Sequence, residues 1–430
     1  MAGAFSYMED QELIPHLFRT EYRKIIAVLC KLFGFEHIEI AEDIVSDTFL
    51  LASETWGLKG LPANPTAWLY AVAKNKAKDV LKHTSIFTQK IAVELQQNVT
   101  TSQCPEIDLS NKNINDSQLE MMFAVCHPCI STEAQIGLSL HILCGFGVDE
   151  IADAFLTNRE TIYKRLARAK EKLRTEKVQI ELPGEMETNS RLETVLTTLY
   201  LLFSEGYYST SQNTTLRKEL CIEAIRLNVM LTENEQTNTP STNALLSLMC
   251  FHSSRFEART NQNGDIVLYE DQDTNLWSKE LIEKGELYLN KSSQGKEISK
   301  YHLEAAIAYW HTNKSDTKEK WENILQLYNR LLQIEYSPMA ALNRTYALSK
   351  ANGKKEAIIE AEKLNLTETH LYHSLLGNLY TDVDNARASR HFHTALTLAK
   401  TNADKTIIAA NIARLTQKIN CEIEPSERPE

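Results

Sequence analysis

The chain has 430 residues, of which 43% are apolar and 24% charged, and its formal net charge is −11. This composition is typical of a globular protein with sizeable cores, and the length suggests roughly two to four domains. No segment approaches the ~18 continuous apolar residues of a membrane span, so an integral membrane protein is not expected.

The N-terminus, MAGAFSYMEDQEL, turns acidic at once and has no basic segment followed by an apolar run, so no secretion signal is visible. The eight cysteines are scattered, which fits a reducing compartment better than a disulfide framework. We therefore expect a cytoplasmic protein. Glycine and proline are sparse, at 14 and 10 residues, and apolar residues recur with helical spacing, so the sequence predicts an all-α fold.

The first 84 residues predict helices of contrasting charge. An apolar helix spans 13–33, and the segment AEDIVSDTFLLASETW follows it. In that segment an acidic shoulder stands beside an apolar stripe. The shoulder consists of Glu42, Asp43 and Asp47, and the stripe of Ile44, Val45, Thr48, Phe49 and Ala52.

The next segment, NPTAWLYAVAKNKAKDVLKH, predicts a basic helix with Asn64 as its cap and Pro65 in its first turn. Its polar face carries Lys74, Asn75, Lys76, Lys78 and Lys82. Aromatic groups beside lysines and an amide can hold unstacked bases and follow the phosphates of one strand. The alternative interpretation of Trp68 is a core residue, which is the commoner role of a lone tryptophan.

Residues 88–117 are polar, rich in β-branched residues and without a helical period. They predict a linker over 85–117 that connects two domains.

Cys126 and Cys129 precede His141 and Cys144 at a spacing that tetrahedral zinc could use. The intervening sequence predicts a helix, and twelve helical residues would hold the two pairs roughly 18 Å apart. Zinc needs both pairs within ~4 Å, so we favour buried core cysteines and expect no metal.

Residues 147–174, GVDEIADAFLTNRETIYKRLARAKEKLR, have the pattern of a helix-turn-helix. Asn158 can cap the second helix by accepting a backbone N–H from Glu160 or Thr161. Ile162, Leu166, Ala169 and Leu173 recur at three- and four-residue steps and are expected to pack inward.

The helix-turn-helix concentrates positive charge in an acidic chain. Eight basic residues lie between Arg159 and Lys177, against three glutamates. Such a concentration indicates a polyanion such as DNA, although an ordinary solvated amphipathic helix gives the same pattern.

The 41–83 segment resembles conserved region two of bacterial RNA polymerase sigma factors, and residues 121–174 resemble their region four. Order and spacing are similar to those of the extracytoplasmic-function type. The phrases MMFAVCHPCISTEAQIGLSLHILCGF, LYLLFSEGYYST, EDQDTNLW and AALNRTYALSKANG resemble a subgroup whose long helical C-terminal extension ends in tetratricopeptide-like repeats.

The resemblance implies a sigma factor that directs core RNA polymerase to promoters, with contacts to the β′ clamp coiled coil and the β flap. The clamp contact would fall on Glu42, Asp43, Asp47 and Phe49. Minus-ten DNA would meet Trp68, Lys74, Asn75, Lys78 and Lys82. Minus-thirty-five DNA would meet Arg159, Thr161, Lys164, Arg165 and Arg168. The resemblance implies no catalytic residue, cofactor or metal.

The C-terminal half predicts further helices with one apolar face. It divides into a helical domain over 185–298 and repeats over 299–420. The sigma-like domains that precede them span 1–84 and 118–178. The sequence NQNGDIVLYEDQD predicts a hairpin-like element. A polar set in this half could line a signal site. Its members are Glu205, Tyr207, Glu270, Asp271, Asp273 and Trp277.

Past residue 335 a repeat has the tetratricopeptide offset of 34 residues. It pairs Leu342 with Leu376, Tyr346 with Tyr380, Ala361 with Ala395 and Leu364 with Leu398. A weaker preceding unit contains Tyr309, Trp321 and Leu325. Stacked helix pairs of this kind present a concave face to a partner, so we expect a regulatory protein or ligand to bind the extension.

Two other classes of function remain open. An enzyme is not expected, because no nucleophile–base pair, glycine-rich phosphate loop or convincing metal motif is present. A conventional helix-turn-helix regulator with a tetratricopeptide sensor is the closer alternative. Such a regulator has no use for the acidic stripe at 41–52 or the basic helix after it, and binds duplex DNA without polymerase.

Overall fold

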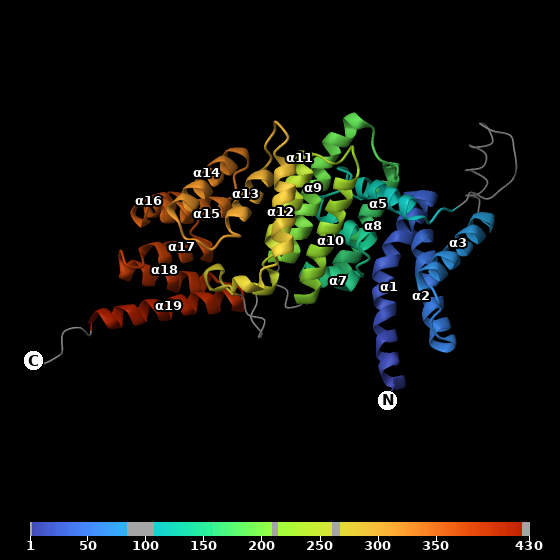
Figure 1. Ribbon diagram of the computed structural model, residues 1–430, viewed down its shortest axis with the longest axis horizontal. Coiled ribbons are helices and arrows are strands. Elements are labelled where there is room, and N and C mark those ends of the chain that lie inside the picture. The colour runs from blue at the N-terminus through green and yellow to red at the C-terminus, as the bar shows by residue number, and fades with distance from the viewer. Residues whose placement is uncertain (1, 84–106, 156, 209–213, 260–266, 424–430) are drawn as a thin grey trace, which may run out of the picture. The chain divides into compact units, whose positions relative to one another are not determined.

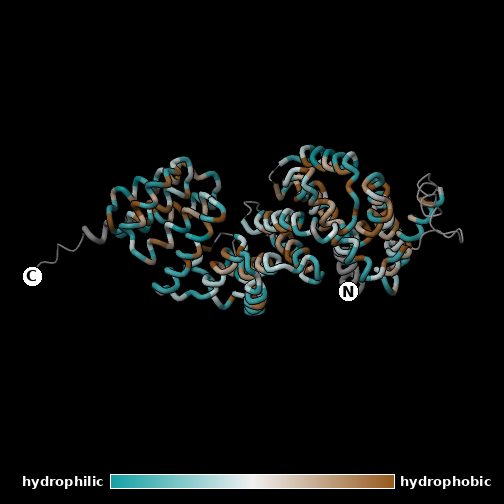
Figure 2. The backbone as a smooth tube through the Cα atoms, turned by 90° about the horizontal axis from the view of Figure 1, so that it is seen from above, coloured by the Kyte–Doolittle hydropathy of each residue, from teal (hydrophilic) through white to brown (hydrophobic). Residues whose placement is uncertain are grey.

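A computed structural model describes residues 2–83, 107–155, 157–208, 214–259 and 267–423. This part of the chain is helical and contains no strand, which confirms the all-α prediction. The chain forms two compact units, Met1–Asn238 and Thr239–Glu430, whose helices are labelled in Figure 1. In both units polar and apolar stretches alternate along the helices (Figure 2), as expected where each helix buries one face. Within the described residues, no helix combines the length and apolarity that crossing a membrane would require.

The first unit begins with the helices that carry the acidic and basic segments. They are α1 (Ala2–Phe33), the 3-10 turn η1 (Phe35–His37), α2 (Ile38–Lys59) and α3 (Pro65–His83). The predicted stripe of α2, from Ile44 to Ala52, is buried. Asn64 caps α3 as predicted, since its Oδ1 accepts the Ala67 N–H at 2.9 Å.

The predicted linker is wrong at its C-terminal end, because α5 (Asn111–Val125) already begins at residue 111. The Ser110 side chain accepts the N–H of Asn113, and Asp108 accepts the N–H of Ser110 at 2.8 Å. Together these two polar side chains satisfy N–H groups at the start of a helix whose own periodicity is weak. The part of the predicted linker between 85 and 106 lies outside the described residues.

Two helices form over the residues predicted as a helix-turn-helix. They are α7 (Val148–Ala154) and α8 (Arg159–Thr175), and they follow α6 (Thr132–Leu138) and the π-helical turn η2 (Ser139–Leu143). Asn158 caps α8 by accepting the Thr161 N–H at 2.8 Å. All four residues expected to face inward, from Ile162 to Leu173, are buried.

Two further helices complete the first unit. They are α9 (Glu185–Tyr208) and α10 (Thr214–Glu233). Both helices pack against α5, α9 also against α6, and α10 also against α7. The segment expected as one domain over 185–298 is therefore divided between the two compact units.

The second unit starts with a helical segment interrupted by turns. Its elements are α11 (Pro240–Ser253), η3 (Phe256–Ala258), η4 (Tyr269–Asp271), η5 (Thr274–Leu276) and α12 (Lys279–Ser292). The expected hairpin lies mostly outside the described residues. At its ends the Val267 N–H donates to the Arg259 carbonyl at 2.8 Å, and two 3-10 turns follow Val267. The Asn263–Gly264 pair that suggested the hairpin lies outside the described residues.

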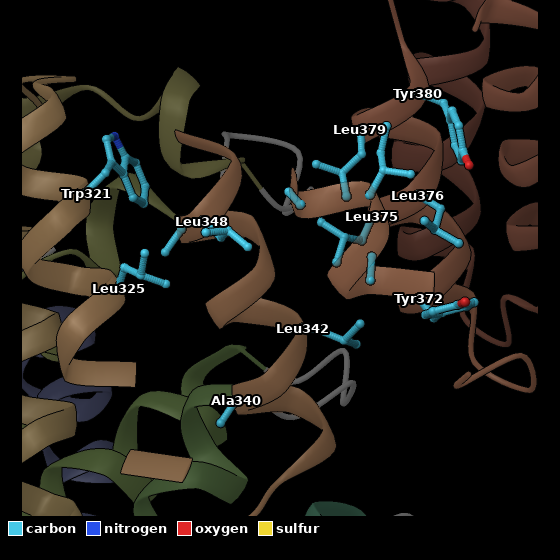
Figure 3. Close-up of a cluster of buried hydrophobic side chains, with 14 of the residues drawn as sticks. Trp321, Leu325, Ala340, Leu342, Leu348, Tyr372, Leu375, Leu376, Leu379 and Tyr380 are labelled. Carbon is cyan, nitrogen blue, oxygen red and sulfur yellow. The ribbon is translucent and has the colours of Figure 1, made fainter. Parts of the chain in front are cut away.

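The rest of the second unit is a run of helices, each packed against the next. They are α13 (Lys300–Trp310), α14 (Lys318–Ile334), α15 (Pro338–Ala351), α16 (Lys354–Leu364), α17 (His370–Tyr380), α18 (Asn385–Leu398) and α19 (Asn402–Ile423). Figure 3 shows part of their common apolar core, which includes Leu342 and Leu376 from α15 and α17. A Cβ on Gly377 would lie 2.6 Å from the Phe392 ring, so glycine permits the close contact of α17 and α18.

Candidate nucleic-acid interface

The exposed side of α8 borders an open groove of about 630 Å³. One wall is the turn before α6, with Cys129, Ile130 and Ser131, together with Ala134 of α6. The other wall is the basic face of α8, with Thr161, Lys164, Arg165, Arg168 and Lys172. Four of the five predicted DNA-binding residues of α8 thus line one groove. Lys172, which the sequence reasoning did not select, joins them.

The cations of this groove are held to different degrees. The Arg165 guanidinium lies 5.8 Å from the centre of the Phe155 ring, a cation–π distance that restricts its rotamers. Lys164 pairs with Glu160 at 2.6 Å on the same helix. Arg168 is exposed and has no ion-pair partner among the described residues. The fifth predicted residue, Arg159, lies outside the groove and pairs with Asp149 at 3.5 Å.

A second basic surface lies on α3. Asn75 and Lys82 are exposed, and Lys74 and Lys78 are half-buried. Trp68 is also half-buried and meets Trp56 edge to face, with ring centres 5.4 Å apart. Trp68 thus packs against Trp56 and keeps part of its surface accessible. Both interpretations, a core residue and a residue that stacks on unpaired bases, are compatible with this position.

Helix α2 presents an exposed stripe beside α3. Residues at helical spacing lie on this stripe, and all are exposed: Asp43, Asp47, Leu50, Glu54 and Leu58. Leu50 is 60% and Leu58 is 88% exposed. Lys76 of α3 reaches Asp47 at 3.1 Å. An exposed row of carboxylates and leucines is suited to a partner that offers apolar groups and cations.

Two of the residues assigned to polymerase lie elsewhere on α2. Phe49 is buried, and its ring meets that of Phe18 with centres 4.9 Å apart. Glu42 forms an ion pair with Lys170 of α8, and its Oε1 lies 3.4 Å from His141 Nε2. Burial acts to raise the pKa of Glu42, but the hydrogen bonds from His141 and Lys170 outweigh it and lower that pKa. In this arrangement Asp43 and Asp47 are exposed, Asp47 beside Lys76, whereas Glu42 and Phe49 are largely buried within the chain.

The polar residues considered for a signal site are divided between the two units. Glu205 and Tyr207 belong to α9 of the first unit, where burial raises the pKa of Glu205. The others belong to the second unit. There Glu270 accepts the Tyr346 hydroxyl at 3.1 Å, Asp273 caps the turn η5, and Trp277 is buried.

The cysteine and histidine residues around α6 serve packing in this structure. Cys126 and Cys144 are buried, and burial raises the pKa of Cys126 to about 11. His141 turns its Nδ1 to the Phe146 carbonyl at 3.0 Å. Among the residues that the structure describes, no three His, Cys, Asp or Glu side chains are grouped as metal ligands would be.

The sequence reasoning missed the contacts that join distant segments of the first unit. Arg23 of α1 pairs with Glu223 of α10, and Glu223 also accepts Arg226 Nε at 2.8 Å. Arg226 in turn donates to the Leu143 carbonyl at 2.8 Å. No local pattern signals these partners, because up to 200 residues separate them.

Comparison with known proteins places the chain in a family. Residues 191–293 match a family of unknown function, DUF6596, so the match begins in α9 and extends across the boundary of the two units. The uncharacterized protein R00370 of Rhizobium meliloti (strain 1021) is 32% identical over 376 residues, or 86% of this chain and 88% of that protein. No solved structure matches significantly. With this identity over most of both lengths, the chain belongs to the same protein family as R00370 of Rhizobium meliloti.

Proposed function

We propose that this protein is a sigma factor of the extracytoplasmic-function type, which directs core RNA polymerase to specific promoters. The observation that carries the proposal is the combination, in one compact unit, of two basic helices with an exposed acidic and apolar stripe. A regulator that binds duplex DNA alone needs the helix-turn-helix but has no role for the other two surfaces.

The two basic helices suit two kinds of DNA contact. Helix α8 and its groove offer cations and a hydroxyl at the position where a helix-turn-helix meets the major groove. Helix α3 offers lysines, an amide and a half-buried tryptophan, a set that suits an unpaired strand. We assign the minus-thirty-five element to α8 and the minus-ten element to α3.

The stripe of α2, from Asp43 to Leu58, is assigned to the β′ clamp coiled coil of core polymerase. Asp43 and Asp47 supply its charge and Leu50 its apolar contact. The packed helices from α13 to α19 are assigned a regulatory role as tetratricopeptide-like repeats that bind a protein or ligand. Their support is the 34-residue offset, which places Leu342 and Leu376, and Ala361 and Ala395, at equivalent buried positions.

The test is run-off transcription on fragmented genomic DNA with purified core polymerase, with and without this protein, followed by mapping of new 5′ ends. New starts that share two elements at a fixed spacing are the expected result. If no new starts form and the protein binds duplex DNA without polymerase, the conventional regulator replaces the sigma factor.

A pair of variants sharpens the test. Asp43→Lys with Asp47→Lys reverses the charge of the stripe and should abolish association with core polymerase. Glu283→Lys with Glu286→Lys makes the same charge change on exposed positions of α12 and should leave association intact. Equal association of both double variants would remove the assignment of the stripe.

A further inference from the structure

Aromatic and cationic side chains cluster in the second unit, where η4 contacts the start of α14. The hydroxyl of Tyr269 donates to the carbonyls of His311 and Asn313, at 3.1 and 3.2 Å. The same hydroxyl accepts Lys320 Nζ at 3.3 Å. The Arg255 guanidinium lies 5.4 Å from the centre of the Tyr269 ring. Segments that are distant in the sequence therefore meet around one phenol.

Lys320 is a buried cation without a carboxylate partner in the described part of the chain. Only 3% of this residue is exposed. Its Nζ donates to the Tyr269 hydroxyl and the Asn313 carbonyl, which are both uncharged. An ammonium has three N–H donors, so one donor of Lys320 is left without an acceptor among these residues. Taking a charge out of water is costly unless an opposite charge or further hydrogen bonds compensate for it.

The charges around Lys320 leave an excess of positive charge. Burial lowers the pKa of Lys320, Asp316 opposes this shift, and Arg255 and Lys350 add to it. Asp316 is already engaged, because it accepts Lys350 at 3.0 Å and also the indole N–H of Trp321. Two cations thus act on Lys320 against one shared carboxylate, so the cluster favours an additional anion.

Buried polar atoms beside Tyr269 have no hydrogen-bond partner among the residues that the structure describes. They include Trp277 Nε1 and His311 Nδ1, and the ring centres of these two residues lie 6.1 and 5.2 Å from that of Tyr269. Trp277 is 6% exposed, and its Nε1 can only donate. Buried polar groups almost always have partners, so these atoms indicate that a further molecule binds beside Tyr269.

Water alone would not complete this cluster. A water molecule can satisfy Trp277 Nε1 and His311 Nδ1, but it carries no charge to balance Lys320. Burial, together with the cations Arg255 and Lys320, lowers the pKa of His311 to about 3, so this ring is neutral at pH 7 and does not repel a ligand by charge. An anion with several oxygens meets both needs, since it accepts N–H groups and balances the buried ammonium.

The position of the cluster limits the size of the ligand. Tyr269, His311 and Lys350 are partly exposed, whereas Lys320 and Trp277 are buried. A small anion can reach Lys320 through rotamer changes of the partly exposed side chains, which are fast where side chains contact solvent. A polymer such as DNA cannot enter in this way.

We propose that Arg255, Trp277, His311 and Lys320 bind a small oxyanion, a carboxylate or phosphate group, beside Tyr269. Arg255 and Lys320 supply the positive charge, and Trp277 supplies an N–H donor. The bound anion links η4 and η5 to the start of α14. This site lies in the second unit, and it goes beyond the proposed function, which places the contacts with DNA and polymerase in the first.

The experiment titrates the full-length protein with sodium phosphate and, separately, with sodium succinate, at an ionic strength held constant with sodium chloride. Tryptophan fluorescence follows binding, because Trp277 and Trp321 belong to the cluster. A saturable change with at least one anion is expected, together with slower hydrogen exchange over residues 269–277 and 318–325. A response to phosphate alone or to succinate alone identifies the group that binds. No saturable response to either anion would overturn the site.

Variants test which cations hold the anion. Lys320→Met removes the buried charge and keeps an unbranched side chain, so it should abolish the response. Lys318→Met is the matched control on the same helix, because Lys318 is exposed and pairs with Glu322 at 3.5 Å. It should bind the anion as the unchanged protein does. Equal responses of both variants would indicate a general salt effect and would overturn the site.

A second variant protects the test against misfolding of the first. Arg255→Met leaves Lys320 in place and should raise the Kd of the anion about tenfold, the loss expected for one hydrogen bond to a charged group. An unchanged Kd in this variant would contradict the assignment of Arg255.

The run-off transcription assay separates this proposal from the sigma function, because anion binding is measured without polymerase. Saturable binding that depends on Lys320, without transcription, keeps the anion site and refutes the sigma function. Transcription without anion binding keeps the sigma function and overturns the anion site.

Discussion

The two compact units differ in the burial of their ion pairs. In the first unit, largely buried ion pairs join residues far apart in the sequence, such as Arg23 with Glu223 and Glu42 with Lys170. In the second, ion pairs such as Arg344 with Glu360 are more exposed, and apolar side chains join each helix to its neighbour along the chain. A change of charge should therefore act on the arrangement of the first unit, whereas a change of volume should act on the stability of the second.

The largest effect is expected from a cavity in the second unit. Phe392 is 1% exposed and packs against Gly377, so Phe392→Ala should lower the free energy of unfolding by about 4 kcal/mol. Hydrogen exchange of α17 and α18 in the full chain measures the loss locally. Leu371→Ala on α17 is the control, because Leu371 is 40% exposed and should cost far less. Equal losses would contradict the apolar stack as the source of stability.

The second effect concerns charge in the first unit. Glu223→Met leaves Arg23 and Arg226 without their carboxylate in a largely buried site, and should destabilise the first unit by about 3 kcal/mol. Chemical denaturation followed by hydrogen exchange in α1 and α10 tests this. Lys164→Met removes an exposed pair of α8 and should cost less than about 1 kcal/mol. A stable Glu223→Met protein would show that apolar packing alone holds α1 on the rest of the first unit.

Local structure was predictable from the sequence where a physical cause acts over a few residues. The caps Asn64 and Asn158, the buried stripe of α2 and the inward face of α8 all follow from helical spacing and capping chemistry. The start of α5 was missed because Ser110 and Asp108 act through geometry that composition does not reveal. The turns η4 and η5 follow the segment in which an Asn-Gly pair and a short apolar run had suggested a hairpin.

The candidate interface was predictable only in part, because its residues come from segments that are distant in the sequence. The basic residues of α8 line a groove, but its other wall comes from α6 and the turn before it, which no pattern in α8 indicates. Glu42 looked like its neighbours Asp43 and Asp47 in the sequence. Its different role depends on Lys170, whose proximity is a property of the tertiary structure alone.

Acid should weaken the contact of Glu42 with Lys170, between α2 and α8, selectively. The folded-state pKa of Glu42 lies below its ordinary value of 4.5, so its contribution is fully present above pH 4.5 and is lost as the pH falls through the folded pKa. Energy transfer between dyes introduced through unnatural amino acids at the exposed positions 63 and 179 should therefore decline below pH 4.5. Glu42→Gln should flatten this dependence. Glu133→Gln removes a carboxyl of lowered pKa on α6 and should not flatten it.

Two cations of the groove, Arg165 and Arg168, should contribute differently to DNA binding. Arg165 is restrained over Phe155 and is suited to a fixed base. Under the proposed sigma function, Arg165→Ala should therefore cost about 1–3 kcal/mol at one promoter position and relax specificity there. Arg168 is exposed and unrestrained by an ion pair among the described residues, so Arg168→Ala should weaken all sequences equally. It should also reduce the salt dependence by about one phosphate contact. Holoenzyme affinities for promoter variants at several salt concentrations test both, and identical profiles would refute the division.

The smallest effect is expected at the cap of α8. Asn158→Ala removes the acceptor of the Thr161 N–H and should lower stability by about 1 kcal/mol, with the loss confined to hydrogen exchange in the first turn of the helix. Asn158→Asp keeps an acceptor at the same position and should retain most of the stability. Because the cap lies at the end of α8 opposite to Lys170 and Arg174, neither variant should change energy transfer between positions 63 and 179. A change in transfer with Asn158→Ala would show that the start of α8 is coupled to the contact of Glu42 with Lys170, and the first unit would then respond to local helix stability as well as to charge.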